Sequence, residues 1–501
     1  MIKYIFNFLI FVLLVTSLNA KDSFFVKNIV LDGVLKSSDI DPIISKHRFK
    51  NRTLQEINLI ANELEDYYKS IGYTLVEVTI PKQDIKDGIL HLKLNIAKVG
   101  DISVEGEKHY TKEFIQNGIV QKSGDLLNYQ NLIKSLLLLN DYRDLKVSSF
   151  LRKSSLVDST DIVLKVEDEK PLHVDVWYDN LGSEDTSKNR LGVDFFYGNL
   201  FRDGDEVTIN PVLSFAPSKT KFVSTNYSIP INNLQTKLRF GFLYADYLAG
   251  GDFTDLSSEG DTLIYSTGIV HPLIRSITNR VDFSFNLTKK LAKNYLLDQI
   301  SSDEDITFFD TSVLWQNYSI YSTSSLYFSI AKGELSGNSI KSRVDEDSDF
   351  FKTNIQFFYN RTMNEKTNLL YTLNGQYSSS KLPPTEMFSI GGLTTVRGFK
   401  SGFKLGDSGF FTSLAGYYMF NLAEKKSLKI GAFCDYGKVY VNEPVPGEDR
   451  ESFLIGAGVE GILNINDKYS SRLSLGYPLD SSDDLYKKKL NLYLTISAKL
   501  W

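Results

Sequence analysis

The last two thirds of the chain alternate between apolar and polar residues, and this pattern limits the possible folds more than any other feature. From about Pro171 to Trp501 the alternation is interrupted at short intervals by Gly, Asn, Asp and Ser, as in strands joined by turns. No run here approaches the roughly 20 apolar residues that a membrane-spanning helix needs. A soluble sheet of this length would need covering helices, and the sequence predicts none in this region. A closed barrel in a bilayer needs no such cover, because lipid contacts its outer face and polar groups fill its interior.

The length of this region predicts the size of the barrel. Residues 171–501 number 331, and a tilted membrane strand with its share of turns and loops takes roughly 20 residues. We therefore expect a transmembrane antiparallel β-barrel of about 16 strands. The last expected strand carries apolar residues on one face, at Leu492, Leu494, Ile496, Ala498 and Leu500. The terminal Trp501 falls out of phase with that face.

The N-terminus predicts export from the cytoplasm. Residues 1–20 combine the basic Lys3, an apolar stretch and small residues near Ala20, which is the pattern of a cleaved secretory signal peptide. The chain has 56 basic and 61 acidic side chains and a formal net charge of −5, which argues against a nucleic-acid binder. The single cysteine, Cys434, excludes an internal disulfide and a thiolate metal cluster.

Residues 24–169 follow a different pattern, in which a strand, two helices and two strands occur twice. In the first copy, Thr53 and Glu56 have the spacing of a capping box at the start of a helix. In the second copy, residues 129–140 predict an apolar helix. Each copy predicts a small α+β domain whose helices cover a three-stranded sheet. The edge strand of such a sheet can pair with an extended peptide.

Two motifs in this part resemble the POTRA domains of two-partner secretion transporters, the TpsB family. The segment from Ile80 to Leu90 resembles the Pro-x-Gln-x-x-x-x-Gly-x-Leu signature of the first POTRA domain, and residues 136–140 resemble the Leu-Leu-Leu-Asn run of the second. The resemblance implies a first POTRA domain over residues 24–99 and a second over residues 100–169. It also implies that the partner-binding residues include Pro81, Gln83, Asp84, Gly88 and Leu90.

The barrel part, residues 171–501, contains a long loop that resembles a further motif of this superfamily. Residues 382–407 resemble the sixth loop of proteins that combine POTRA domains with a barrel, and this loop folds back inside the barrel. The tip of that loop is a Val-Arg-Gly-aromatic sequence, which this chain carries as Val396, Arg397, Gly398 and Phe399. Three shorter stretches, residues 179–183, 199–205 and 272–276, resemble turns and strand ends of the same family.

A wall motif downstream supplies the expected counterpart of the tip. The sequence Phe433-Cys-Asp435-Tyr-Gly437 resembles the Phe-x-Asp-x-Gly motif of the inner barrel wall, and its even spacing places these three residues on one face of a strand. An arginine carries five donors in a planar fork and stays charged, and a carboxylate can accept two of them at once. We therefore expect Arg397 and Asp435 to fix the loop inside the barrel. Cys434 then faces lipid or is buried.

The resemblance implies an outer-membrane translocator of a Gram-negative bacterium, with its POTRA domains in the periplasm. Such a protein captures an unfolded secreted partner of the TpsA type (a haemolysin, adhesin or contact-dependent toxin) and exports it through the barrel without ATP. We expect no catalytic residue, metal or cofactor, because the five His residues lack site spacing and no phosphate-binding loop with Lys occurs. Outer-membrane lipid and the barrel assembly machinery are further expected partners.

Several alternatives stay open on sequence alone. An insertase that assembles other outer-membrane barrels would share the arginine loop, although residues 81–90 favour secretion. A passive porin needs no POTRA domains, and an enzyme needs site motifs that the sequence lacks. Acidic clusters at residues 252–261, 303–305 and 345–349 predict solvated loop tips rather than calcium sites, since EF-hand spacing is absent. Known family members carry a plug helix before the first POTRA domain. Only about four residues precede the first strand after the expected cleavage site, so we expect this protein to lack that plug.

Overall fold

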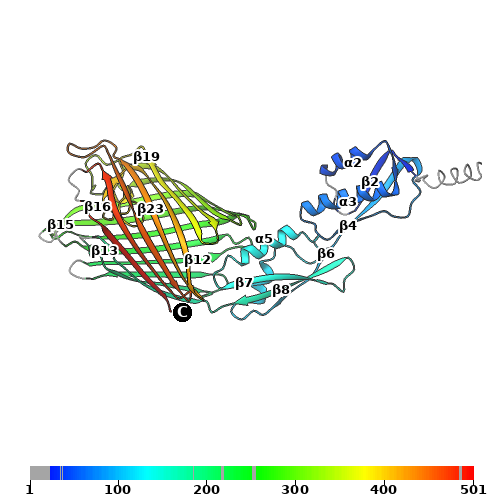
Figure 1. Ribbon diagram of the computed structural model, residues 1–501, viewed down its shortest axis with the longest axis horizontal. Coiled ribbons are helices and arrows are strands. Elements are labelled where there is room, and N and C mark those ends of the chain that lie inside the picture. Colours follow the sequence, from blue (N-terminus) through cyan, green and yellow to red (C-terminus); the bar gives the residue numbers. More distant parts are fainter. Residues whose placement is uncertain are drawn as a thin grey trace, which may run out of the picture. The chain divides into compact units, whose positions relative to one another are not determined.

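The computed structural model describes residues 23–500 except 34, 36–37, 184–185, 216–218, 251–255 and 484–487. The expected signal peptide and the expected phase of Trp501 therefore lie outside the described residues. The chain divides into two compact units, and the strands of the second, from green to red, form a barrel (Figure 1). No described helix is both long enough and apolar enough to cross a bilayer. The first unit comprises Met1–Gly106, Ile115–Leu136 and Val147–Val166, and the second comprises Glu107–Phe114, Leu137–Lys146 and Glu167–Trp501.

The first copy of the predicted repeat is a small α+β layer. Its central strand β5 is parallel to β2 and antiparallel to β4, which gives a sheet of order β2-β5-β4. Apolar residues of α3 and β5 are buried together in one core, which includes Ile57, Leu64 and Leu92. The elements are β1 (Ser23–Val26), β2 (Asn28–Asp32), α2 (Asp41–His47), β3 (Lys50–Thr53), α3 (Leu54–Ser70), β4 (Val76–Thr79) and β5 (Ile89–Ile96), with 3₁₀ turns at Ser38–Ile40 and Lys86–Gly88.

Helix α3 begins where the capping-box spacing predicts. The Glu56 amide donates to the Thr53 hydroxyl at 3.3 Å, and the Thr53 amide donates to the Glu56 carboxylate at 2.8 Å. The four residues before it form β3, which the sequence did not predict and which pairs with β1 in a separate two-stranded sheet. A strand this short gives too little alternation to recognise in a sequence.

The second copy repeats the order of the first. Its strands form a three-stranded sheet of order β6-β8-β7, in which β6 and β8 are parallel. Two α+β copies, each with a three-stranded sheet, are therefore confirmed. The elements are β6 (Lys98–Glu105), α4 (Lys112–Asn117), α5 (Tyr129–Leu139), β7 (Leu145–Lys153) and β8 (Ser159–Asp168).

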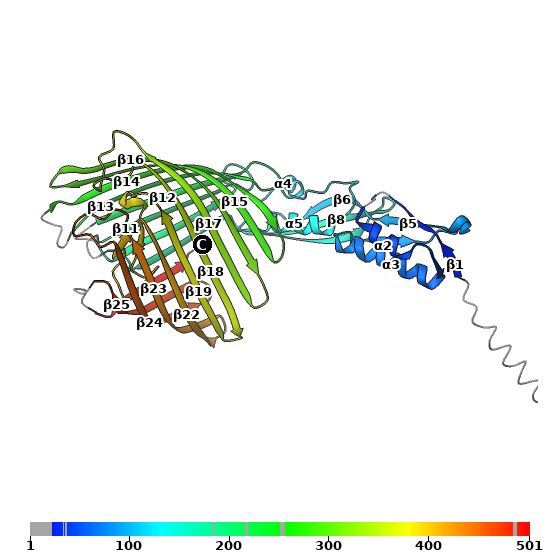
Figure 2. The same cartoon turned by 90° about the horizontal axis from the view of Figure 1, so that it is seen from above.

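The second unit contains a closed antiparallel barrel of 16 strands, which confirms the predicted number. Its first strand β9 pairs with its last strand β26, and the strands run obliquely along the barrel (Figure 2). The strands are β9 (Leu172–Asp179), β10 (Arg190–Gly198), β11 (Glu206–Ser214), β12 (Lys219–Pro230), β13 (Lys237–Leu248), β14 (Glu259–Arg275), β15 (Asn279–Leu296), β16 (Gln299–Tyr318), β17 (Ser322–Leu335), β18 (Asp349–Asn364), β19 (Thr367–Ser378), β22 (Ser408–Ala423), β23 (Lys426–Tyr440), β24 (Glu451–Ile465), β25 (Tyr469–Ser481) and β26 (Asn491–Lys499).

The side chains of the barrel alternate between two faces, as the sequence pattern predicts. On β15, Phe283, Phe285 and Leu287 lie on the exposed outer face, where lipid surrounds a barrel of this kind. Three of the connections on the side where β9 ends join strands in the second half of the barrel. They are loop 5 (residues 336–348), loop 6 (residues 379–407) and loop 7 (residues 441–450).

Candidate functional site

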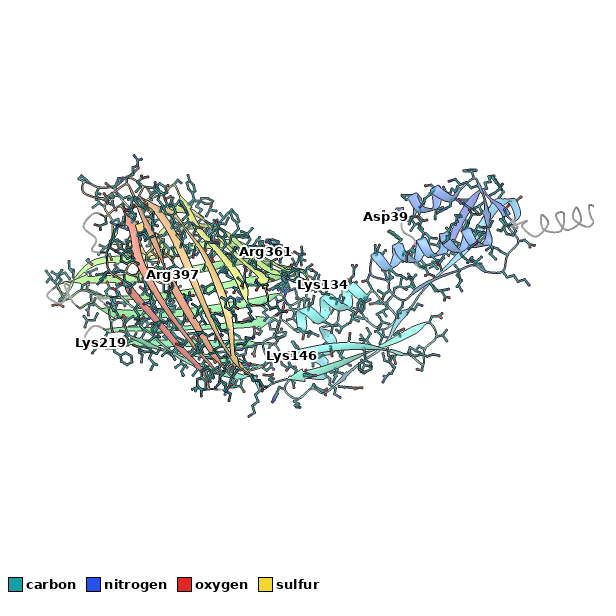
Figure 3. The ribbon with its side chains drawn as sticks, in the orientation of Figure 1. Asp39, Lys134, Lys146, Lys219, Arg361 and Arg397 are labelled. Atoms are coloured by element: carbon teal, nitrogen blue, oxygen red, sulfur yellow. The ribbon has the colours of Figure 1, made fainter. Side chains whose placement is uncertain are left out.

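Loop 6 connects β19 to β22 and folds into the barrel interior. It contains a 3₁₀ turn at Pro384–Glu386 and two short strands, β20 (Phe388–Ile390) and β21 (Lys404–Gly406), that pair with each other. At its tip, Val396 and Phe399 are 0% and 1% exposed and pack in one cluster with side chains of β22, β23 and β24. Figure 3 labels Arg397 within the outline of the barrel. The loop is therefore seated against the inner wall.

Arg397 and Asp435 form a bidentate ion pair between the loop tip and β23. Arg397 Nε donates to Asp435 Oδ2 and Nη2 donates to Oδ1, both at 2.7 Å. The backbone amide of Arg397 adds a third bond to Oδ2 at 3.0 Å. Arg397 is 5% exposed and Asp435 is fully buried. This geometry fixes both the position and the direction of the tip.

Neighbouring strands complete a neutral network around this pair. Ser413 on β22 donates to Asp435 at 2.6 Å and accepts from Arg397 at 3.0 Å. Glu460 on β24 lies 3.5 Å from Arg397 Nη1 and is held at 2.8 Å by Arg472 of β25. Two arginines thus face two carboxylates, and the burial of Arg397, Asp435 and Glu460 makes their pairing necessary.

Phe433 supplies an aromatic face beneath the guanidinium. The Arg397 Cζ atom lies 3.3 Å from the centroid of the Phe433 ring. A guanidinium over an aromatic face gains about 2 kcal/mol or more where water is excluded. Phe433 and Asp435 therefore act on the same arginine from one strand face, while Cys434 between them points to the exposed outer face.

Three wall glycines leave room for the backbone of the loop tip. A Cβ atom on Gly437 of β23 would lie 2.8 Å from the Val396 side chain, and one on Gly456 of β24 would lie 1.9 Å from the Arg397 carbonyl oxygen. A Cβ atom on Gly476 of β25 would lie 2.6 Å from the Gly398 amide. Glycines on three adjacent strands therefore form a shallow seat that only a side chain-free wall provides.

The strand that closes the barrel also holds the tip. Tyr493 on β26 accepts a bond from the Gly398 amide at 3.0 Å and donates to the Phe399 carbonyl at 2.8 Å. Gly398 has a φ of +102°, a conformation that side chain-bearing residues rarely adopt. The tip therefore contacts β22 to β26, five neighbouring strands in the barrel order.

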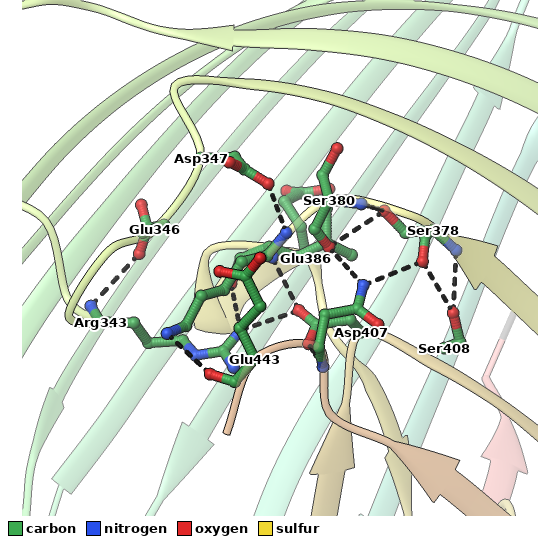
Figure 4. Close-up of polar contacts among 12 residues, drawn as sticks. Arg343, Glu346, Asp347, Ser378, Ser380, Glu386, Asp407, Ser408 and Glu443 are labelled. Carbon is green, nitrogen blue, oxygen red and sulfur yellow. Dashed lines mark hydrogen bonds and ion pairs between the residues drawn. The ribbon is translucent and has the colours of Figure 1, made fainter. Parts of the chain in front are cut away.

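The outer end of loop 6 is tied to its neighbouring loops through Asp407 (Figure 4). Asp407 is fully buried and accepts from Arg343 of loop 5 at 2.8 Å and from the Leu382 amide at 2.7 Å. Its second oxygen accepts from the Asn442 amide of loop 7 at 2.7 Å. One carboxylate thus joins both ends of loop 6 to loops 5 and 7.

The sequence matches the models of a protein family and of a domain. The family model of the haemolysin secretion/activation protein ShlB/FhaC/HecB matches residues 158–462, more than half of the chain, and the model of the ShlB-type POTRA domain matches residues 24–96. The chain belongs to the ShlB/FhaC/HecB family. This family comprises TpsB-type outer-membrane transporters, which are protein transporters and not enzymes.

Similar proteins share this architecture over most of their length. The heme/hemopexin transporter protein HuxB of Haemophilus influenzae is 24% identical over 89% of this chain and 81% of its own. The outer membrane transporter CdiB of Dickeya dadantii is 20% identical over 85% of this chain and 77% of its own. The solved structure of CdiB from Escherichia coli has a TM-score of 0.85 at 20% identity, covering 97% of this chain and 92% of that one. This last likeness shows the fold.

Family membership gives the location and the class of partner. The barrel lies in the outer membrane and the POTRA domains lie in the periplasm. TpsB transporters act with secreted partner proteins of the TpsA type.

The POTRA signature of the ShlB/FhaC/HecB family closes a sheet edge in this structure. The last pair between β4 and β5 is Thr79 with Lys93. Continuing this register would place Pro81 opposite His91, but Pro81 has no N–H to donate to the His91 backbone. The Gln83 side chain replaces it. Its amide donates to the His91 carbonyl at 2.6 Å and accepts from the His91 amide at 2.8 Å.

The other signature residues divide between the fold and the surface. Leu90 is fully buried in the core. Gly88 has a φ of +71°, and its carbonyl accepts from the Lys27 amide at 2.7 Å. Pro81 and Asp84 are exposed. The partner-binding role of these five residues stays a prediction, and Pro81 and Asp84 have the accessible side chains.

The expectation of solvated loop tips is wrong for the second acidic cluster, because residues 303–305 lie within strand β16. Asp303 and Asp305 pair with Lys293 at 3.1 Å and Lys289 at 3.3 Å, and Asp347 accepts from the Lys381 amide at 2.7 Å. Residues 252–255 of the first cluster lie outside the described residues. Among the residues that the structure describes, no group of three or more His, Cys, Asp or Glu side chains could hold a metal ion.

Sequence reasoning missed the residues that surround the ion pair from other strands. They have no motif of their own and are Ser413, Tyr417, Gly456, Glu460, Arg472, Gly476 and Tyr493. Glu460 and Arg472 are charged residues on the inner faces of their strands, and this was the one feature of the sequence that could have indicated their role. Only the register of β22 to β26 brings these positions together.

Proposed function

We propose that this chain exports an unfolded TpsA-type partner through its barrel to the cell surface or medium, without ATP. The observation that carries the proposal is the seat of loop 6. A barrel of 16 strands is wide enough for an aqueous channel, and here Arg397 and Asp435 hold a loop inside it. Side-chain contacts hold this obstacle, so it can be displaced without breaking the hydrogen bonds between the wall strands.

The POTRA domains supply the capture step in this proposal. A three-stranded sheet with an open edge can pair with an extended segment of an unfolded protein. The partner then passes the displaced loop and folds outside, and its folding gives the movement a direction. Outer-membrane lipid surrounds the exposed apolar belt, and the barrel assembly machinery inserts the chain.

The names of the relatives support a proposal for the class of partner. HuxB is named a heme/hemopexin transporter protein and CdiB an outer membrane transporter. We propose a partner that is a haemolysin, an adhesin or a contact-dependent toxin, encoded beside this chain.

The experiment is a secretion assay with matched arginine variants. We expect Arg397→Ala to remove most of the partner from the medium, while the amount of transporter in the membrane stays unchanged. Arg361→Ala is the control, because Arg361 is an exposed arginine of β18 (labelled in Figure 3). Normal export by Arg397→Ala would refute the role of the seated loop.

The alternative is an insertase that assembles other barrels. The structure of BamA from Haemophilus ducreyi lacking POTRA domains 1–3 has a TM-score of 0.56 at 14% identity, covering 96% of this chain and all of that one, which shows a shared fold alone. Deleting the gene separates the two functions. Loss of the partner from the medium supports the export function, whereas reduced levels of unrelated barrel proteins in the outer membrane support the insertase function.

A further inference from the structure

Loop 6 has a buried ion triad far from its tip. Glu386 ends the 3₁₀ turn at Pro384–Glu386, and its Oε2 atom accepts from Lys352 of β18 at 2.6 Å. Its Oε1 atom accepts from Lys290 of β15. The Lys290 ammonium also donates to the Thr385 carbonyl at 3.2 Å. The Glu386 side chain is 4% exposed, and the two lysine side chains are 12% and 13% exposed.

Such a triad is better suited to positioning than to stabilising. Desolvation of three charges offsets much of their attraction, so a buried ion pair adds little net stability. Removing one partner is costly, however, because it leaves a buried charge without a counter-charge. The position of the turn is therefore strongly specified even though the fold gains little.

The triad and the tip hold loop 6 at separate places on the wall. The barrel order runs β15-β16-β17-β18-β19-β22-β23, so Lys290 lies six strands from Asp435 and Lys352 lies three strands from it. Next to the triad, Leu382 is fully buried against Ile306 and Phe350 of β16 and β18. Asp407 holds the two ends of the loop. With its tip as the one further contact with the wall, residues 383–395 could swing between those points, whereas the triad fixes this part as well.

We propose that Glu386 is a positioning residue that forms a second anchor of loop 6, separate from the Arg397 anchor. Each anchor restrains one part of the loop, and both have to release before the barrel opens fully. This inference rests on the proposed role of loop 6 as the obstacle in the barrel. It extends that role because it predicts a partly open state in which the tip stays seated.

The backbone around Glu386 keeps its own contacts when the carboxylate is removed. Gln376 of β19 donates to the Glu386 carbonyl at 2.9 Å and to the Asp407 carbonyl at 3.1 Å. A Glu386→Gln variant has nearly the same size and keeps these bonds. We therefore expect it to fold and to lose the counter-charge of Lys290 and Lys352.

The test measures ion current through the purified full-length protein in planar lipid bilayers. No partner is needed, so the result does not depend on whether secretion is observed. We expect Glu386→Gln to open to a partial conductance at least tenfold more often than the unaltered protein, and Glu386→Gln with Arg397→Ala to reach full conductance. Glu365→Gln is the matched control, because Glu365 is an exposed residue of the β18–β19 turn.

A charge exchange separates positioning from a general packing defect. The triple exchange of Glu386→Lys with Lys290→Glu and Lys352→Glu keeps opposite charges at both contacts of residue 386, and we expect it to restore the quiet current that the single changes lose. Heat-modifiable mobility on gels confirms that each barrel is folded. If Glu386→Gln matches Glu365→Gln, or if the exchange rescues nothing, the second anchor is refuted.

Discussion

A methyl group in the glycine seat should expel the tip of loop 6. The perturbation is Gly456→Ala, because an added Cβ atom would lie 1.9 Å from the Arg397 carbonyl oxygen. Ordinary contact of a Cβ atom begins at 3.4 Å, so the tip must retreat by roughly 1.5 Å. The two bonds of 2.7 Å between Arg397 and Asp435 would then exceed hydrogen-bonding range.

Losing these two hydrogen bonds costs enough free energy to unseat the loop. Hydrogen bonds between charged groups contribute roughly 1.5–3 kcal/mol each, so losing two costs about 3–6 kcal/mol. A change of about 5.5 kcal/mol converts a 1:99 ratio of two states to 99:1. We therefore expect a loop that is almost always seated to become unseated much of the time.

The assay combines bilayer conductance with uptake of a large antibiotic such as vancomycin by intact cells. Gly461→Ala is the matched control, because Gly461 lies on the same strand and an added Cβ atom there meets nothing within 4 Å. Gly456→Ala should raise both readouts, and heat-modifiable mobility should show a folded barrel in both variants. Equal behaviour of the two variants would refute the seat.

Three further predictions concern other parts of the chain. Burial raises the pKa of Glu346 from 4.5 to about 7, and the carboxyl of Glu304 adds to this effect. The protonated Glu346 side chain therefore stabilises loop 5 fully below pH 4.5, and this stabilisation is lost as the pH rises through 7. The hydrogen-exchange protection factors of residues 336–348 should fall over that window, and Glu346→Gln should remove this fall. Thr53→Ala removes the α3 cap at a cost of about 1 kcal/mol, so exchange in the first turns of α3 should speed up roughly fivefold while exchange in α5 stays unchanged. Cys434 should react with a membrane-soluble maleimide and resist a charged one in intact cells, because it faces outward; labelling by the charged reagent alone would contradict this orientation.

Much of the fold could be predicted because its signals are periodic. Alternation between two faces identified the barrel region, and the length of that region, at roughly 20 residues per strand, predicted the number of strands. The cap of α3 could be predicted because the bonding of Thr53 and Glu56 depends on residues three apart. Strand β3 escaped prediction, because four residues that pair with β1 carry no periodic signal.

The candidate site could be predicted only where its residues form contiguous motifs. Arg397 and Asp435 each lie in such a motif, so their partnership could be expected. Glu460 and Gly456 come from a strand with no recognisable motif, and their roles follow from the register of β24 beside β23. Gln83 shows the opposite case, because a residue expected to bind a partner has its amide bonded to the backbone of His91.

The central claim is that the partner passes through the barrel, and site-specific photocrosslinking tests it most directly. On β16, Ser312 is buried and shares a face with Ile306, which packs on Leu382 of loop 6, while Phe309 is exposed on the opposite face. A photocrosslinker is placed at each position while a partner with a folded C-terminal domain is stalled in transit. We predict crosslinks to the partner from Ser312 and none from Phe309. Crosslinks from Phe309 alone, or none from Ser312 during active secretion, would contradict the account.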